Sequence, residues 1–147
     1  EKYAVRVGGG YNHRKGLGDG ILVKDNHIEA VRQTGMGLGE IISKLRAVAP
    51  HYLRIEVEVE NLTDVNEALQ AGAEILLLDN MGSHDMAEAV KLVCGRAILE
   101  ASGGINLNNV QTVAATGVDY ISVGALTHST RSLDMSLELD NVIQYQS

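Results

Sequence analysis

The stretch RIEVEVENL at residues 54–62 decides the fold. Its β-branched residues at every second position predict a strand with one apolar face. The alternate positions are all acidic and share the opposite face: Glu56, Glu58 and Glu60. A central strand of an open doubly wound sheet is covered by helices on both faces and is apolar throughout. Since only one face here can pack on helices, the sequence favours a barrel with the glutamates pointing inward.

Other apolar runs repeat the same unit of strand, turn and helix. The expected strands are 20–24, 54–60, 74–80, 97–104 and 120–126, and the expected helices are 37–49, 63–72, 83–95 and 106–117. Such repeats imply a parallel sheet with right-handed crossovers. The fold class is therefore α/β, an incomplete TIM-like α/β barrel, because five strands are fewer than the eight of a closed one.

The barrel portion is expected to occupy residues 1–132, followed by a C-terminal edge strand or tail of the same domain over 133–147. The stretch RSLDMSLELDNVI at 131–143, most of which belongs to this tail, is interpreted as an edge strand leaving the barrel.

Composition excludes several classes of protein. The chain has 147 residues, a net charge of −7, a single cysteine and no apolar run of membrane-spanning length. These features predict one globular domain without a disulfide framework, outside the membrane and in the cytoplasm. Five of its twelve basic residues lie within the first 24 positions, namely Lys2, Arg6, Arg14, Lys15 and Lys24. A local cationic cluster on an acidic protein indicates a small anionic ligand and argues against nucleic acid.

Polar residues and glycines gather where the expected strands end, which is where α/β barrels place their active sites. They are Lys24, Asp25, Asn26, Glu58, Glu60, Asp79, Asn80, Glu100, Ser102, Gly103, Gly104, Ser122 and Gly124. The turn 102–104 leads into a helix expected to begin near Asn106, and glycines before a helix favour phosphate binding. His13 and Arg14, behind three glycines, suit a carboxylate. The histidines lack zinc-site spacing. Carboxylates beside a sugar phosphate can hold Mg²⁺ or stabilise an oxocarbenium-like transition state.

Five motifs together resemble the quinolinate phosphoribosyltransferase family. They are GGGYNHRKGLGDGILVKDNHI (8–28), EVEVENL (56–62), LLLDNM (76–81), LEASGGI (99–105) and GVDYISVGALTHS (117–129). The resemblance implies conversion of quinolinate and phosphoribosyl pyrophosphate into nicotinate mononucleotide, pyrophosphate and CO₂, with Mg²⁺, in NAD biosynthesis.

The resemblance also implies roles for individual residues. His13 and Arg14 are expected to bind the carboxylates of quinolinate, and Lys24 is expected to contact the anionic substrates. Lys24, Glu58 and Asp79 are the expected catalytic residues. Glu58 and Asp79 are also expected to bind the ribose and the metal. The residues expected to bind the 5′-phosphate are Ser102, Gly103, Gly104, Gly124 and His128. Of the other glutamates of the opening stretch, Glu56 is expected to pair with a cation inside the barrel, and Glu60, at the rim, either to be solvated or to help cap the following helix.

Two features of the family do not occur in this sequence. These are an N-terminal domain and a first barrel strand with a TRKT-like motif. The chain is therefore expected to be the C-terminal barrel portion of a homodimer or higher oligomer, with little activity alone. Three alternatives share part of the pattern: a molybdenum-transport-associated pyrophosphorylase-like paralogue, a phosphate-binding barrel isomerase or lyase, and a non-catalytic barrel domain that binds phosphate ligands.

Overall fold

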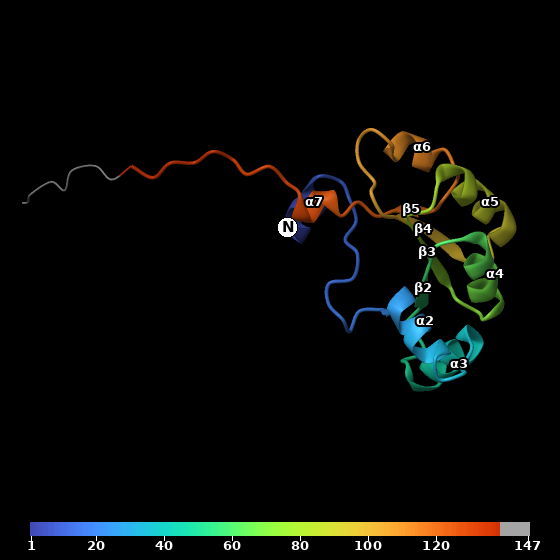
Figure 1. Ribbon diagram of the computed structural model, residues 1–147. Helices are drawn as coiled ribbons and strands as arrows, with labels where there is room; N and C mark the ends of the chain where they lie inside the picture. The colour runs from blue at the N-terminus through green and yellow to red at the C-terminus, as the bar shows by residue number, and fades with distance from the viewer. Residues whose placement is uncertain (139–147) are drawn as a thin grey trace, which may run out of the picture.

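The computed structural model describes residues 1–138 of the chain (Figure 1). Five strands form one sheet: β1 (Ile21–Val23), β2 (Ile55–Val59), β3 (Ile75–Asp79), β4 (Ile98–Ser102) and β5 (Tyr120–Ile121). The helices are α1 (Lys2–Val7), α2 (Asp25–Arg32), α3 (Leu38–Val48), α4 (Leu62–Gln70), α5 (Ser83–Val93), α6 (Val110–Ala114) and α7 (Ala125–His128). No helix in this described part is both long enough and apolar enough to cross a membrane.

The sheet grows in one direction along the chain. Its order is β1-β2-β3-β4-β5, and every neighbouring pair is parallel. A doubly wound sheet would reverse this order at a switch point and carry helices on both faces. Figure 1 instead shows α4 and α5 on one face, with the blue N-terminal segment on the opposite side. The prediction of an incomplete α/β barrel is confirmed.

The two faces of β2 differ in the predicted way. Ile55, Val57 and Val59 are at most 1% exposed and belong to the core between sheet and helices. On neighbouring strands, Leu76, Leu78 and Ala101 bury the same face completely. The glutamates of β2 therefore point to the opposite face, away from the helices, which we call the inner face of the sheet.

Backbone register sets which side chains meet on the inner face. Glu58 lies opposite Leu77, and Asp79 lies opposite Ser102. Two carboxylates at the strand starts help to hold this register. Glu74 accepts a hydrogen bond from the Ile55 amide at 2.9 Å, and Asp119 accepts one from the Leu99 amide at 2.8 Å.

Two elements near the C-terminus are shorter than the sequence predicted. The strand expected over 120–126 ends at Ile121, and the chain then turns into α7. The helix expected to begin near Asn106 begins at Val110. The delay has a local cause, since the Asn109 side chain accepts from the Asn106 amide at 2.8 Å and the Asn106 side chain from the Asn108 amide at 2.9 Å. These side chains stabilise a turn in place of the first helical turn.

The edge strand expected over 131–143 does not form over residues 131–138, and the remainder lies outside the described residues. Alternation predicted a strand here because Leu133, Met135 and Leu137 share one face. Their exposed fractions are 81%, 84% and 89%, so this segment lies away from the sheet. An alternating pattern forms a strand only where a neighbour supplies the ladder of hydrogen bonds.

Candidate functional site

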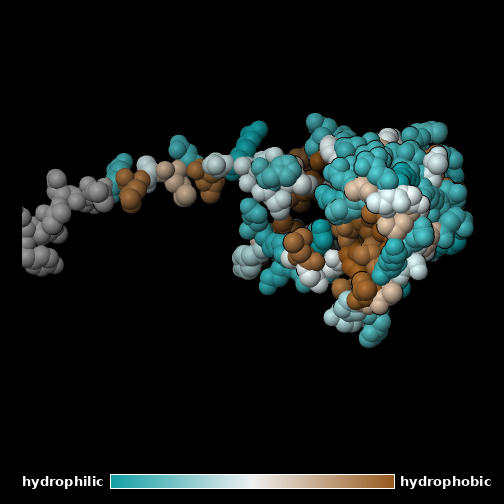
Figure 2. Space-filling view, turned by 60° about the horizontal axis from the view of Figure 1, so that its bottom comes forward, coloured by the Kyte–Doolittle hydropathy of each residue, from teal (hydrophilic) through white to brown (hydrophobic). Residues whose placement is uncertain are grey.

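Three hollows open on the sides of the sheet and are named here by their chemistry. The arginine hollow, of about 730 Å³, is lined by residues that include His13, Arg14, Arg54, Glu56, Glu100 and Ser122. The acidic hollow, of about 290 Å³, includes Asp25, Glu58, Glu60 and Asp64. The glycine hollow, of about 560 Å³, includes His13, Ser102, Gly103, Gly104, Gly124 and His128. Figure 2 shows apolar surface, in brown, along the side of the body that faces the N-terminal segment.

His13 is brought onto the inner face by the segment between α1 and β1. The Lys2 ammonium donates to the backbone oxygens of His13 and Arg14, at 3.2 and 2.9 Å, which anchors this segment. Nε2 of His13 lies 3.6 Å from Oε2 of Glu56 and 3.9 Å from Oε1 of Glu100. The Glu56 carboxylate is the main reason why the pKa of His13 is raised, and it outweighs burial and Arg14, which lower it.

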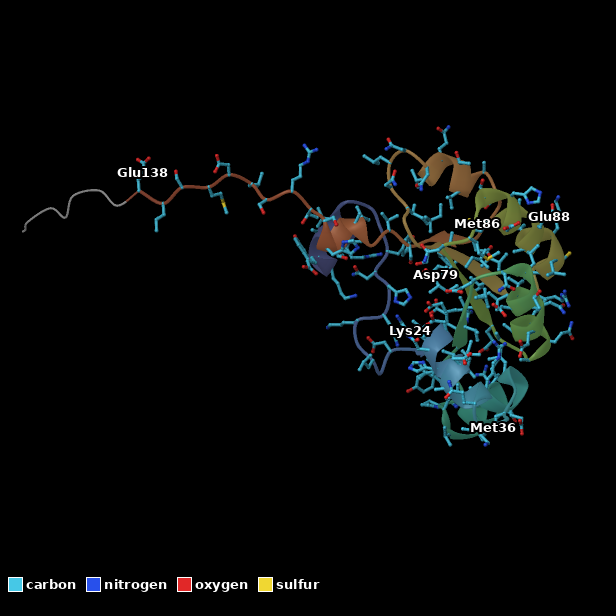
Figure 3. All side chains as sticks on the ribbon, viewed as in Figure 1. Lys24, Met36, Asp79, Met86, Glu88 and Glu138 are labelled. Atoms are coloured by element: carbon cyan, nitrogen blue, oxygen red, sulfur yellow. The ribbon has the colours of Figure 1, made fainter. Side chains whose placement is uncertain are left out.

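Glu58, Lys24 and Asp79 come together from three adjacent strands. Lys24 follows β1 as the N-cap of α2, and Asp79 ends β3. Burial raises the pKa of the half-buried Glu58, Lys24 opposes this rise, and the carboxylate of Asp79 adds to it. Figure 3 labels Lys24 and Asp79 on the side of the sheet opposite α4 and α5. The predicted acidic pair is thus one electrostatic unit with its lysine.

The turn after β4 depends on its two glycines. Gly103 has φ +86°, and a β-carbon there would lie 2.7 Å from the backbone nitrogen of Asn80, besides colliding with the Asn80 side chain. Gly104 has φ +59°, but nothing lies within 4 Å of the position of its β-carbon. Gly103 is therefore required by packing, whereas Gly104 leaves open space at the hollow that a ligand can enter.

Gly124 and His128 complete the glycine hollow. A β-carbon on Gly124 would lie 2.7 Å from Nε2 of His128, so the imidazole folds back over this glycine. Ser102, Gly103 and Gly104 line the same hollow, so all five residues predicted to bind phosphate lie together. The N-terminus of α6 does not adjoin this turn as expected, since Asn106–Asn109 form a turn before it.

The predicted site residues do not share a single pocket. Glu58 lines the acidic hollow and Arg14 lines the arginine hollow, while the five residues predicted to bind phosphate line the glycine hollow. His13 lines both the arginine and the glycine hollows and so connects them. The arginine and glycine hollows therefore adjoin each other, whereas the acidic hollow shares no lining residue with either of them.

Sequence reasoning missed two contacts. One is the support that Asn80 gives to Gly103, for which the signal is an asparagine directly after a strand, a residue that tolerates its φ of 53°. The other is the set of groups around His13. Glu56 was expected to pair with a cation, but nothing in the sequence identified His13 as that cation or Glu100 as a second neighbour. Glu60, as expected, is exposed.

Comparison with known proteins gives consistent matches. Residues 1–138 match the family description "Quinolinate phosphoribosyl transferase, C-terminal domain". The nicotinate-nucleotide pyrophosphorylase [carboxylating] of Mycobacterium leprae is 49% identical over 144 residues, covering 95% of this chain and 48% of the relative. A probable enzyme of the same name from Bacillus subtilis is 47% identical over 139 residues, covering 95% and 47%.

A solved structure agrees with these sequence matches. NadC from Streptococcus pyogenes superposes with a TM-score of 0.82 at 46% identity, covering 93% of this chain and 47% of that one. The chain thus spans about half the length of the curated relatives that it matches.

Proposed function

The chain belongs to the quinolinate phosphoribosyl transferase family, and we propose that its inner face serves the transfer of a phosphoribosyl group to quinolinate with loss of CO₂. The substrates are quinolinate and phosphoribosyl pyrophosphate. The products are nicotinate mononucleotide, pyrophosphate and CO₂, in a step of NAD biosynthesis. The names and identities of the relatives support this proposal.

One observation carries the proposal. Burial raises the pKa of Glu58, and the charges of Lys24 and Asp79 lie close enough to lower and raise it in turn; Asp79 also lies opposite Ser102, where the glycine turn begins. Carboxylates are thus positioned beside a turn that is open at Gly104. A sugar phosphate with its phosphate at the turn would extend its ribose towards these carboxylates. This combination suits chemistry at the anomeric carbon.

In the proposed mechanism, each set of side chains has its own task. His13 and Arg14 bind the carboxylates of quinolinate and fix the orientation of the ring. The ring nitrogen forms a bond to the anomeric carbon as the bond to pyrophosphate breaks and pyrophosphate leaves. Glu58 and Asp79 stabilise the positive charge that develops on the ribose. The carboxyl group next to the ring nitrogen then leaves as CO₂, and the electron pair left on that ring carbon takes up a proton from solvent.

We propose Mg²⁺ as the metal of this site. Glu58 and Asp79 offer the oxygen ligands that Mg²⁺ prefers, directly or through water and substrate. Burial raises the pKa of Glu58, the carboxylates of Asp79, Asp25 and Glu60 add to this rise, and an added cation would relieve the repulsion among these carboxylates. The bound metal would neutralise negative charge on the departing pyrophosphate.

Two further features belong to the proposal. We expect the active protein to be a homodimer or higher oligomer, as the family resemblance implies. We expect it in the cytoplasm, since its single cysteine, Cys94, is free. Sedimentation velocity and cell fractionation test these two expectations.

Calorimetric titration tests the proposed function. Quinolinate and nicotinate mononucleotide would be titrated, with Mg²⁺, into the 147-residue chain and in parallel into the full-length protein. Nicotinate, which lacks the second carboxylate, serves as the matched control and is expected to bind more weakly than quinolinate. Binding of nicotinate mononucleotide without turnover would favour a non-catalytic phosphate-binding domain. If neither ligand binds to either protein, the proposed function is wrong.

A further inference from the structure

We propose that Glu56 and Glu100 act as positioning residues which keep His13 protonated, so that its Nδ1–H can donate to a substrate carboxylate. This inference rests on the proposed function for the identity of that substrate. It assigns a task to the deepest glutamate of β2, which the mechanism above does not use.

The geometry around His13 supports a charged ring. Both carboxylates approach the same nitrogen, Nε2, at 3.6 and 3.9 Å. At these distances the contacts are longer than a well-formed hydrogen bond, so charge attraction dominates. Glu56 is only 8% exposed, and its Oε1 is buried without a hydrogen-bond partner among residues 1–138. A buried carboxylate with an unsatisfied oxygen favours a positive charge beside it.

Glu100 is held in place by Ser122, the residue that follows β5. The Ser122 hydroxyl donates a hydrogen bond to Oε1 of Glu100, the same oxygen that faces His13. This hydrogen bond fixes the position of that oxygen beside the ring of His13. The ring of His13 therefore meets one carboxylate from β2 and a second from β4.

Protonation decides what His13 can offer to a ligand. A neutral imidazole that uses its one proton on Nε2 has an acceptor lone pair on Nδ1, which repels a carboxylate. The imidazolium has N–H donors on both nitrogens, so Nδ1 becomes a donor while Nε2 stays with Glu56 and Glu100. Arg14 next to it opposes this charge, and Asp19 and Arg54 also line the hollow. The two glutamates thus allow two cations, His13 and Arg14, to sit side by side.

An NMR pH titration of the 147-residue chain tests this inference without any substrate. The pKa of His13 would be followed through its ring carbons in the native chain and in Glu56→Gln, Glu100→Gln and Ser122→Ala. We expect Glu56→Gln to lower the pKa of His13 most and Glu100→Gln to lower it less. His84, whose carboxylate neighbour is Asp85, is the internal control and should not change. The amide spectrum reports whether each variant is folded.

Quinolinate titrations at several pH values supply the second measurement. At pH 7 we expect Glu56→Gln to weaken quinolinate binding by about tenfold, the lower end for a charge-assisted hydrogen bond. Lowering the pH should restore binding in this variant. An unchanged pKa of His13 in both folded glutamate variants would overturn the inference even if quinolinate binds. Absence of quinolinate binding at every pH, with the pKa changes present, would instead count against the proposed function alone.

Discussion

At the scale of single residues, Glu58 links pH, metal binding and stability. Its pKa is raised in the folded chain, chiefly by burial. Below its ordinary pKa both the folded and unfolded states are protonated and there is no effect. As the pH rises through the window up to the raised pKa, the unfolded state ionises first, so the folded state loses stability. In EDTA at pH 7, Glu58→Gln is therefore expected to have a higher Tm than the native chain.

Magnesium should reverse this difference. Adding Mg²⁺ is expected to raise the Tm of the native chain by mass action and to leave Glu58→Gln nearly unchanged. Differential scanning calorimetry at matched ionic strength measures both effects. The exposed Glu60→Gln, two residues further along the chain, is the control. An equal response of all three chains to Mg²⁺ would rule out Glu58 as a ligand.

Arg14 should act on affinity. Its guanidinium lines the arginine hollow next to His13, and removal of a charge-assisted hydrogen bond costs about 1.5–3 kcal/mol. Arg14→Ala is therefore expected to weaken quinolinate binding by about 10- to 150-fold. Lys15→Ala is the matched control, since it removes the adjacent exposed charge and should change affinity little. Calorimetric titration compares the two, and a larger loss from Lys15→Ala would show that the carboxylate binds elsewhere.

At the scale of the elements, the turn after β4 offers a matched pair of substitutions. Gly103→Ala places a methyl group against Asn80 at φ +86°, so the free energy of unfolding should fall by more than the roughly 1–2 kcal/mol of backbone strain. Gly104 has φ +59° and faces open space, so Gly104→Ala should lower the free energy of unfolding by only about 1 kcal/mol. Urea unfolding measures both values.

The same pair should separate stability from ligand binding. Gly104→Ala is expected to weaken the binding of nicotinate mononucleotide by at least tenfold, because its methyl group occupies the space proposed for the phosphate. Its effect on affinity should therefore be large relative to its effect on stability. Unchanged affinity for nicotinate mononucleotide in a folded Gly104→Ala chain would show that the phosphate does not bind at this turn.

The elements also show how far local sequence determines structure. Alternation along β2 predicted both of its faces, since burying one face leaves a single possible register. The strand expected to continue to Leu126 stops at Ile121, because β5 pairs only with β4 among the described strands and the chain can leave the sheet there. Alternation at 131–137 failed for a related reason, since Leu133 and its neighbours meet no adjacent strand within the described residues.

At the scale of the whole molecule, the sequence predicted which side chains lie on the inner face of the sheet. It predicted less well how these side chains are distributed among the three hollows. Lys24, Glu58 and Asp79 could be predicted to lie close together because the carboxyl ends of parallel strands share one edge of the sheet. The sequence could not predict that His13 would turn towards Glu56, because this contact depends on the path of the irregular segment before β1. Contacts made by loops depend on tertiary packing, which leaves little trace in local periodicity.

In the proposed function, phosphoribosyl transfer takes place on this inner face with Glu58 at its centre. The most direct measurement is the release of CO₂ from carboxyl-labelled quinolinate by the full-length protein, with phosphoribosyl pyrophosphate and Mg²⁺. We expect one CO₂ per nicotinate mononucleotide formed. We also expect Glu58→Gln to lower kcat by about 100-fold or more, the scale for losing electrostatic stabilisation of a transition state, with a smaller effect on quinolinate affinity. No CO₂ release by the native protein would show that the proposed function is wrong, and equal turnover by Glu58→Gln would show that Glu58 has no part in the transfer.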